Sequence, residues 1–140
     1  MSTRSHIAVQ RIAEPKTIDY IYCHYDGYPE HHGPILTNHY NTIEKVNELM
    51  ELGDLCSLGE EIGEKHDMDK KPISVNNEKW CSAFGRDRGE YDVMAKTDLM
   101  HNVISDTSVD YLYLFNEYAN KWYCFEFNTK MIDLNEFVNK

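Results

Sequence analysis

Two neighbouring segments near the N-terminus alternate between apolar and polar residues. Residues 6–12 place Ile7 and Val9 on the same side, and residues 17–25 alternate in the same way. A period of two residues is typical of a β-strand with one buried face. The four residues between these segments, 13–16, include a proline and indicate a turn. The sequence therefore predicts an N-terminal β-hairpin.

The rest of the chain predicts further strands and helices around this hairpin. The clearest helix is 41–52, with Asn41 as its cap and Glu44 as the capping-box partner. Because a second hairpin is expected near the C-terminus, we expect a mostly antiparallel sheet. The predicted fold class is α+β, with about five strands (two hairpins plus one), three or four helices packed on one face, and a single domain spanning 1–140.

Local composition places the remaining elements. Runs of aromatic and β-branched residues predict strands, apolar residues at helical spacing predict helices, and clusters of glycine, proline and charged residues predict loops. The further strands are expected at 79–84, 110–115 and 121–127, the further helices at 35–40, 97–105 and after a capping Asp133, and the loops at 26–34, 65–78 and 85–90.

The charge of the chain excludes two classes of partner. It has 24 acidic and 14 basic residues, and its formal net charge is −10. Binding to nucleic acid without regard to sequence requires a basic face that displaces counterions, and docking on an anionic membrane requires one too. No apolar run approaches the roughly 20 residues that span a bilayer. The N-terminus leads into a strand rather than a signal peptide, so a cytosolic protein is expected.

The four cysteines are far apart in the sequence, and none belongs to a C-x-x-C pair. The usual spacings of zinc ribbons and thioredoxin-like sites are therefore absent. A disulfide framework is not expected in a chain without an export signal. We interpret Cys23, Cys56, Cys81 and Cys124 as reduced thiols in or near the core, and we expect no cofactor.

Histidines concentrate where the first hairpin ends. His24 and Asp26 leave the second strand, and His31 and His32 follow in the next loop. Such side chains bind transition metals, or form a general acid–base pair in which His24 and Asp26 transfer protons. The alternative is a polar strand end whose side chains bond to backbone and water, since the spacing matches no metal motif. These four residues are the metal candidates, and the first two are the catalytic candidates should the chain be an enzyme.

Segment 85–90 carries two arginines between two glycines. A guanidinium donates parallel hydrogen bonds to a phosphate or a carboxylate, so this loop is a candidate ligand site. Alternatively, its charged residues pair with one another, which contributes little to stability. A P-loop is excluded, because the Gly-Lys-Ser/Thr ending is missing. The candidate ligand-binding residues are Tyr28, Arg86, Asp87, Arg88 and Glu90.

An acidic stripe follows the outer side of the expected helix 41–52. Glu44, Glu48 and Glu51 lie at helical spacing on that side. A charged outer face is the ordinary condition of a surface helix. The functional alternative is a patch that meets a basic partner or mimics a nucleic-acid backbone. These three glutamates are the candidate partner-binding residues.

Four motifs resemble a family of small proteins encoded by bacteriophages and prophages. The motifs are TRSxIAV at 3–9, IYCHYDGYP at 21–29, GDLxSLG at 53–59 and GRDRGE at 85–90. The resemblance extends to the strand at 111–115, and Cys56 departs from it, because the family pattern has serine there. The resemblance implies an accessory protein expressed in the host cytoplasm. Proteins of this kind often bind and neutralise a host factor, and some sequester a nucleotide signal.

Three functions follow from these observations. The first is a non-enzymatic phage protein that neutralises a host factor. That factor is either a defence or regulatory protein bound by the acidic helix, or a nucleotide bound by the arginine loop. The second is a small hydrolase or nuclease acting on a phosphorylated substrate, which requires loops 24–32 and 85–90 to converge. The third is a structural or assembly protein that forms homo-oligomers through its tyrosine-rich strands.

Overall fold

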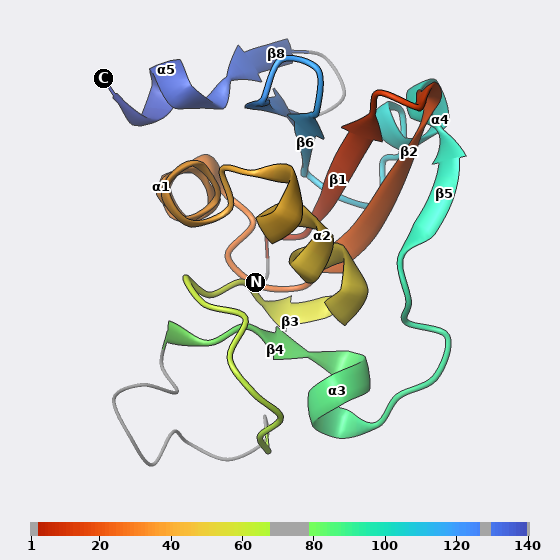
Figure 1. Cartoon of the computed structure of the whole chain (residues 1–140), viewed down its shortest axis with the longest axis vertical. Coiled ribbons are helices and arrows are strands. Elements are labelled where there is room, and N and C mark those ends of the chain that lie inside the picture. The colour runs from red at the N-terminus through yellow and green to blue at the C-terminus, as the bar shows by residue number, and fades with distance from the viewer. Residues whose placement is uncertain (1–2, 68–78, 127–129, 140) are drawn as a thin grey trace.

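The computed structural model describes residues 3–67, 79–126 and 130–139, and Figure 1 shows how they are arranged. Over these three ranges the chain forms eight strands and five helices. The strands are β1 (Ser5–Arg11), β2 (Glu14–Cys23), β3 (Leu55–Ser57), β4 (Ser82–Ala83), β5 (Lys96–Leu99), β6 (Tyr111–Asn116), β7 (Lys121–Glu126) and β8 (Lys130–Asp133). The helices are α1 (Pro29–His39), α2 (Ile43–Leu52), α3 (Phe84–Arg88), α4 (Met100–Ile104) and α5 (Leu134–Val138).

The eight strands of the described ranges form one mixed sheet. Its order is β4-β3-β2-β1-β6-β7-β8, and β5 pairs with residues 17–20 of β2. The pairs β1–β6 and β2–β3 are parallel, and the other pairs are antiparallel. The prediction of a mostly antiparallel sheet of about five strands is therefore wrong, although the α+β class agrees.

Both expected hairpins are confirmed. β1 and β2 run antiparallel, from Ser5 opposite Cys23 to Arg11 opposite Glu14. The strand β2 already begins at Glu14, so the connection is the tight turn at 12–13 rather than the longer one expected. β6 and β7 form the second hairpin.

The parallel pair β1–β6 lies at the centre of the sheet, with Ser5 opposite Tyr111. β6 is buried continuously from Leu112 to Phe115. A nearly unbroken apolar run is typical of a strand that is covered on both faces. Pairing β1 with β6 therefore gives both strands a buried environment that a hairpin neighbour alone could not supply.

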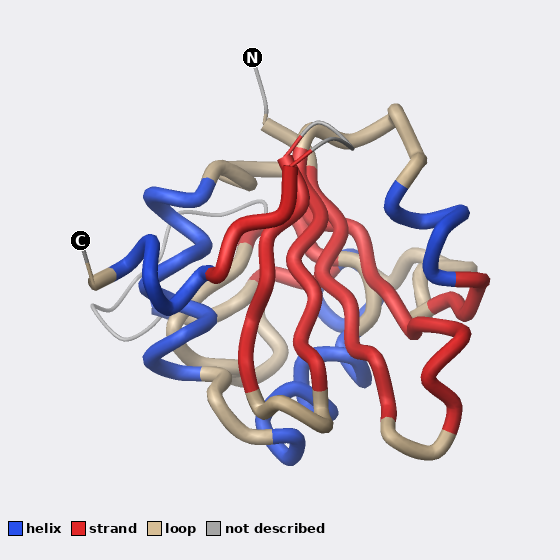
Figure 2. The backbone as a smooth tube through the Cα atoms, turned by 90° about the horizontal axis from the view of Figure 1, so that it is seen from above, coloured by secondary structure: helices blue, strands red, loops and turns tan. Residues whose placement is uncertain are grey.

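Two hydrophobic cores lie on opposite faces of the sheet. Ile7 and Val9 of β1 point into the larger core, to which α1, α2 and α5 contribute apolar side chains. Ala8 points into the smaller core, which Val103 of α4 covers. Figure 2 accordingly shows helical segments on both sides of the strands. The prediction that all helices pack on one face is wrong for α4.

Several element boundaries differ from the sequence prediction. The expected loop 26–34 is mostly helix, because α1 begins at Pro29, where an amide would have no helical partner in any case. The expected loop 85–90 is largely α3, which ends at Gly89 in the left-handed conformation. The expected helix 97–105 is β5 followed by the short α4.

The C-terminal region agrees in part with the prediction. Asp133 caps α5 by accepting hydrogen bonds from the amides of Asn135 and Glu136. The sequence did not predict β8, which precedes this cap. Residues 68–78 of the expected loop 65–78, and residue 127 of the expected strand 121–127, lie outside the described ranges.

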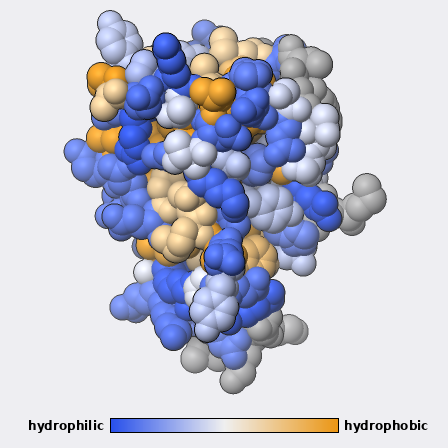
Figure 3. Space-filling view, turned by 90° about the vertical axis from the view of Figure 1, so that its right-hand side faces the viewer, coloured by the Kyte–Doolittle hydropathy of each residue, from blue (hydrophilic) through white to orange (hydrophobic). Residues whose placement is uncertain are grey.

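No helix within the described ranges is long and apolar enough to cross a membrane. Figure 3 shows the side of the molecule that carries β5, where hydrophobic surface is broken into patches among hydrophilic residues. Met94 and Leu99 are exposed apolar residues of this region, with 62% and 47% of their surface accessible.

Candidate functional site

Helix α2 carries the three candidate partner-binding glutamates, and its two ends are fixed by local chemistry. The Thr42 hydroxyl caps it by accepting a hydrogen bond from the amide of Lys45 at 3.3 Å, one residue later than predicted. The helix ends at Gly53, whose φ of 76° favours glycine. A Cβ atom at Gly53 would also lie 2.3 Å from the carbonyl oxygen of Val93. The end of α2 is therefore fitted closely against the segment that precedes β5.

The two sides of α2 differ as the sequence predicted. Val46 and Leu49 are buried in the larger core. Glu44, Glu48 and Glu51 are exposed on the outer side. We call these three glutamates the acidic ridge. Packing of the apolar side fixes the direction in which the ridge faces.

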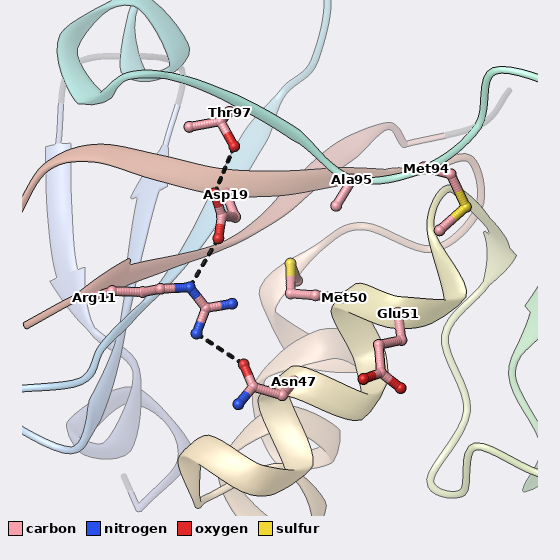
Figure 4. Close-up of a pocket in the computed structure, with 8 residues that line it drawn as sticks. All are labelled: Arg11, Asp19, Asn47, Met50, Glu51, Met94, Ala95 and Thr97. Atoms are coloured by element: carbon pink, nitrogen blue, oxygen red, sulfur yellow. Dashed lines mark hydrogen bonds and ion pairs between the residues drawn. The ribbon is translucent and has the colours of Figure 1, made fainter. Parts of the chain in front are cut away.

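A hollow of about 560 Å³ lies along one side of the acidic ridge, between α2 and the strands β1, β2 and β5. We call it the Arg11 hollow, and Figure 4 shows its walls. Glu51 of the ridge and the exposed Met94 both border it. Its lining residues are Arg11, Asp19, Asn47, Met50, Glu51, Met94, Ala95 and Thr97.

A chain of hydrogen bonds joins the walls of the Arg11 hollow (Figure 4). Arg11 Nε donates to Asp19 at 2.8 Å, and Arg11 Nη1 donates to the side-chain oxygen of Asn47 at 2.8 Å. The Thr97 hydroxyl donates to Asp19 at 2.6 Å. Burial alone would raise the pKa of Asp19, but the bonds from Thr97 and Arg11, with the arginine charge, hold it below its usual value. The hollow therefore has a pre-organised wall with an ionised carboxylate.

The sequence prediction did not include this network. Asp19 alternates with Ile21 and Cys23 on the side of β2 that faces the larger core. A carboxylate on the apolar side of a strand requires a partner, and this was the one indication in the sequence. Nothing in the sequence identified Arg11 as that partner or Asn47 as the next member.

A second hollow, of about 460 Å³, lies on the other side of the acidic ridge. We call it the Glu60 hollow. Glu48 of the ridge borders it, and Glu60 and Glu61 border it from the segment after β3. Its lining residues are Asn38, His39, Tyr40, Asn41, Thr42, Lys45, Glu48, Glu60, Glu61 and Ile62.

Buried hydrogen bonds hold the far wall of the Glu60 hollow. The hydroxyl of the fully buried Tyr40 donates to the carbonyl oxygen of Gly59 at 2.7 Å. The Gly59 amide donates to Cys81 Sγ at 3.3 Å. Since Gly59 directly precedes Glu60, these bonds fix the backbone at the start of the segment that forms this wall.

The arginine segment forms part of a local structural network. Arg86 donates to Asp87 through Nε at 2.9 Å, and its terminal nitrogens donate to the carbonyl oxygens of Ile62 and Cys81. Arg88 forms an exposed ion pair with Glu90 at 3.2 Å. The structure therefore brings four of the five ligand candidates together around α3, with the Arg86 guanidinium engaged by the chain itself.

The histidine loop and the arginine segment leave the sheet in opposite directions. β2 is parallel to β3, and β3 is antiparallel to β4. The chain after β2, which leads through Tyr28 to α1, therefore departs in the direction opposite to α3, which follows β4. Figure 1 shows α1 and α3 in different parts of the molecule. The hydrolase alternative on His24 and Arg86 therefore stays a prediction, to which these chain directions lend no support.

The four metal candidates are distributed among different local contacts. His24 Nδ1 lies 2.7 Å from the Tyr22 hydroxyl, and Asp26 is exposed in the loop with a φ of 57°. The Nδ1 atoms of His31 and His32 are 3.0 Å apart. The pKa of His32 is lowered to about 3, mainly by burial and to a smaller extent by the charge of the neighbouring His31. Among the residues that the structure describes, no group of three or more His, Cys, Asp or Glu side chains is placed to hold a metal ion.

Comparison of the chain with family models, curated proteins and solved structures gave no match. The assignment of a function therefore depends on the geometry of the acidic ridge and its two hollows.

Proposed function

We propose that this protein is a phage-encoded accessory protein that binds a basic surface of a host protein through the acidic ridge and thereby neutralises it. The observation that carries this proposal is the position of the ridge between two hollows. Glu51 borders one hollow and Glu48 borders the other. A partner that binds to α2 can therefore contact a carboxylate and an adjoining hollow on each side of the helix.

Both hollows carry more acidic than basic groups. In the Arg11 hollow, the charges of Arg11 and Asp19 cancel as an ion pair, and Glu51 gives the lining a net negative charge. In the Glu60 hollow, three glutamates stand against Lys45, together with His39. Lys45 lies 3.9 Å from Glu48 in an exposed ion pair, which is weakly held. This excess of carboxylates favours lysine or arginine side chains of a partner and repels acidic ones.

The size of the ridge suits one segment of a protein partner. A helix of this length is about 15 Å long, so both hollows can be reached by a single basic helix or loop. Methionine side chains at the Arg11 hollow offer an adaptable apolar surface to the stems of basic side chains. Arginine is among the residues that most often dominate such interfaces.

The nucleotide alternative has less support from the described contacts. One of its two arginine candidates, Arg86, directs its guanidinium at Asp87 and at two backbone carbonyls. A phosphate would have to replace these bonds, whereas a basic partner can reach the exposed ridge without breaking any core contact.

Capture from host lysate, with charge-reversed variants as controls, tests the proposal. The double variant Glu48→Lys and Glu51→Lys changes both sides of α2, and the exposed Glu136→Lys on α5 makes a similar change elsewhere. We expect one host protein to be held by the wild type and by Glu136→Lys, and to be lost with the double variant. Retention of the same protein by all three baits would refute the assignment to the ridge.

A further inference from the structure

A second cluster of reactive side chains lies away from the acidic ridge, where β4 meets α3. His66 Nε2 is 3.2 Å from the Ser82 hydroxyl. On the other side of the ring, His66 Nδ1 is 2.8 Å from the carbonyl oxygen of Glu64 and 3.5 Å from a carboxylate oxygen of Asp87. A serine, a histidine and an aspartate therefore stand in the order found in serine hydrolases.

The neighbours of the imidazole determine which nitrogen carries its proton. A carbonyl oxygen only accepts hydrogen bonds, so Glu64 requires a proton on His66 Nδ1. Burial alone would raise the pKa of Asp87, but hydrogen bonds from Arg86 and from the amides of Ala83 and His66 hold it below its usual value. Asp87 is thus ionised, and its negative charge 3.5 Å from Nδ1 favours a proton on that nitrogen. In the neutral ring, Nε2 is then unprotonated and accepts the hydrogen bond from the Ser82 hydroxyl.

Hydrogen bonds to the Asp87 carboxylate hold the histidine and serine segments of this cluster in place. The Asp87 side chain is fully buried. It accepts hydrogen bonds from the amide of His66 at 3.1 Å and from the amide of Ala83, the residue after Ser82, at 2.8 Å. One carboxylate therefore fixes the backbone of both the histidine and the serine strand. Trp80 lies against the imidazole, with ring centroids 5.7 Å apart.

We infer that Ser82 is a nucleophile, that His66 is its general base, and that the site cleaves carboxylic esters with short acyl groups. The hollow beside His66 has a volume of about 540 Å³ and is open to solvent. Its lining is charged, with Lys65, His66, Asp67, Asp87, Arg88 and Gly89. A long aliphatic acyl chain would desolvate these charged groups, whereas a short one would leave them in contact with water.

The reaction is balanced without a cofactor. Ser82 Oγ attacks the carbonyl carbon, its proton passes to His66 Nε2, and the carbonyl electron pair moves to oxygen. Collapse of this intermediate expels the alkoxide, which leaves as the alcohol with the proton from Nε2. Water then attacks the acyl-serine, Nε2 accepts its proton and returns it to Ser82 Oγ, and the carboxylic acid is released.

A fluorophosphonate probe tests the assignment on the full chain. Attack by Ser82 would displace fluoride, and mass spectrometry would locate the adduct. We expect labelling at Ser82, none in Ser82→Ala, and at least about a hundredfold slower labelling in His66→Gln, as removal of a general base entails. The control is Ser57→Ala, because Ser57 lies opposite Ser82 on β3 and is also partly buried. An unlabelled wild type, or labelling at Ser82 that is unchanged in His66→Gln, would overturn the inference.

Two further measurements keep the test independent of folding defects in the variants. Nitrogen NMR of the wild-type imidazole should find His66 Nδ1 protonated and Nε2 unprotonated, and the reverse would overturn the argument. The wild type should hydrolyse p-nitrophenyl acetate faster than p-nitrophenyl octanoate. A preference for the octanoate would overturn the proposed acyl specificity.

Discussion

Removal of one buried hydroxyl group tests how the Glu60 hollow is held together. In Tyr40→Phe, the carbonyl oxygen of Gly59 loses its 2.7 Å hydrogen bond. The Cys81 thiol, 3.5 Å from the same oxygen, replaces it only weakly. An unsatisfied buried acceptor costs about 1–3 kcal/mol, so with this partial compensation we expect a loss of about 1–2 kcal/mol. For a chain of this length that corresponds to a fall of about 3–8 °C in Tm.

Urea unfolding followed by tryptophan fluorescence measures this loss directly. The matched control is Tyr118→Phe, because Tyr118 is 87% exposed, and we expect it to change the free energy of unfolding by less than about 0.5 kcal/mol. If Tyr40→Phe is as stable as the control, Tyr40 does not anchor Gly59, and the wall that begins at Glu60 is not fixed as described.

The remaining stability predictions concern a buried histidine and two glycines. The pKa of His32 falls from 6.5 to about 3 on folding, so the unfolded state binds the proton more readily and stability declines as the pH falls below 6.5. Between pH 7 and 4.5 the wild type should lose about 2–3 kcal/mol more than His32→Gln in urea titrations, and equal losses would contradict the burial of a neutral imidazole. Gly63→Ala should cost more than about 2 kcal/mol, because its φ is 71° and a Cβ atom would lie 2.3 Å from the Trp80 ring. Gly89→Ala, with a φ of 73° and open space around it, should cost only about 1 kcal/mol, and thermal unfolding that ranks the two in the opposite order would refute this.

Local patterns predicted the elements that depend on local chemistry. The alternation of residues 6–12 predicted β1, since each side of that strand meets a different core. The apolar spacing of 41–52 predicted α2 and its exposed glutamates, and Asp133 was correctly identified as a cap. In each case the stabilising contact lies within the element or repeats with its period.

The topology and the sites depend on contacts between distant residues. The parallel pairing of Ser5 with Tyr111 joins segments that are far apart in the sequence, and no local pattern encodes it. The glycine and proline residues of 26–34 predict a loop, although the first turn of a helix accommodates Pro29. His66 and Ser82 are held near each other by Asp87, which accepts hydrogen bonds from the amides of His66 and Ala83. These relations arise from tertiary structure, which overrides local preference.

The central claim is that α2 binds a basic host partner with both sides of the acidic ridge. Its most direct test is calorimetric titration of the captured partner, at low and at high salt, with the wild type, Glu136→Lys and the double variant Glu48→Lys and Glu51→Lys. We predict that the wild type and Glu136→Lys bind alike and weaken as salt rises, because exposed charges are screened beyond about 10 Å at 0.1 M. The double variant should bind at least about tenfold more weakly, since like charges then face each other. Equal affinities for all three forms, unaffected by salt, would contradict the account.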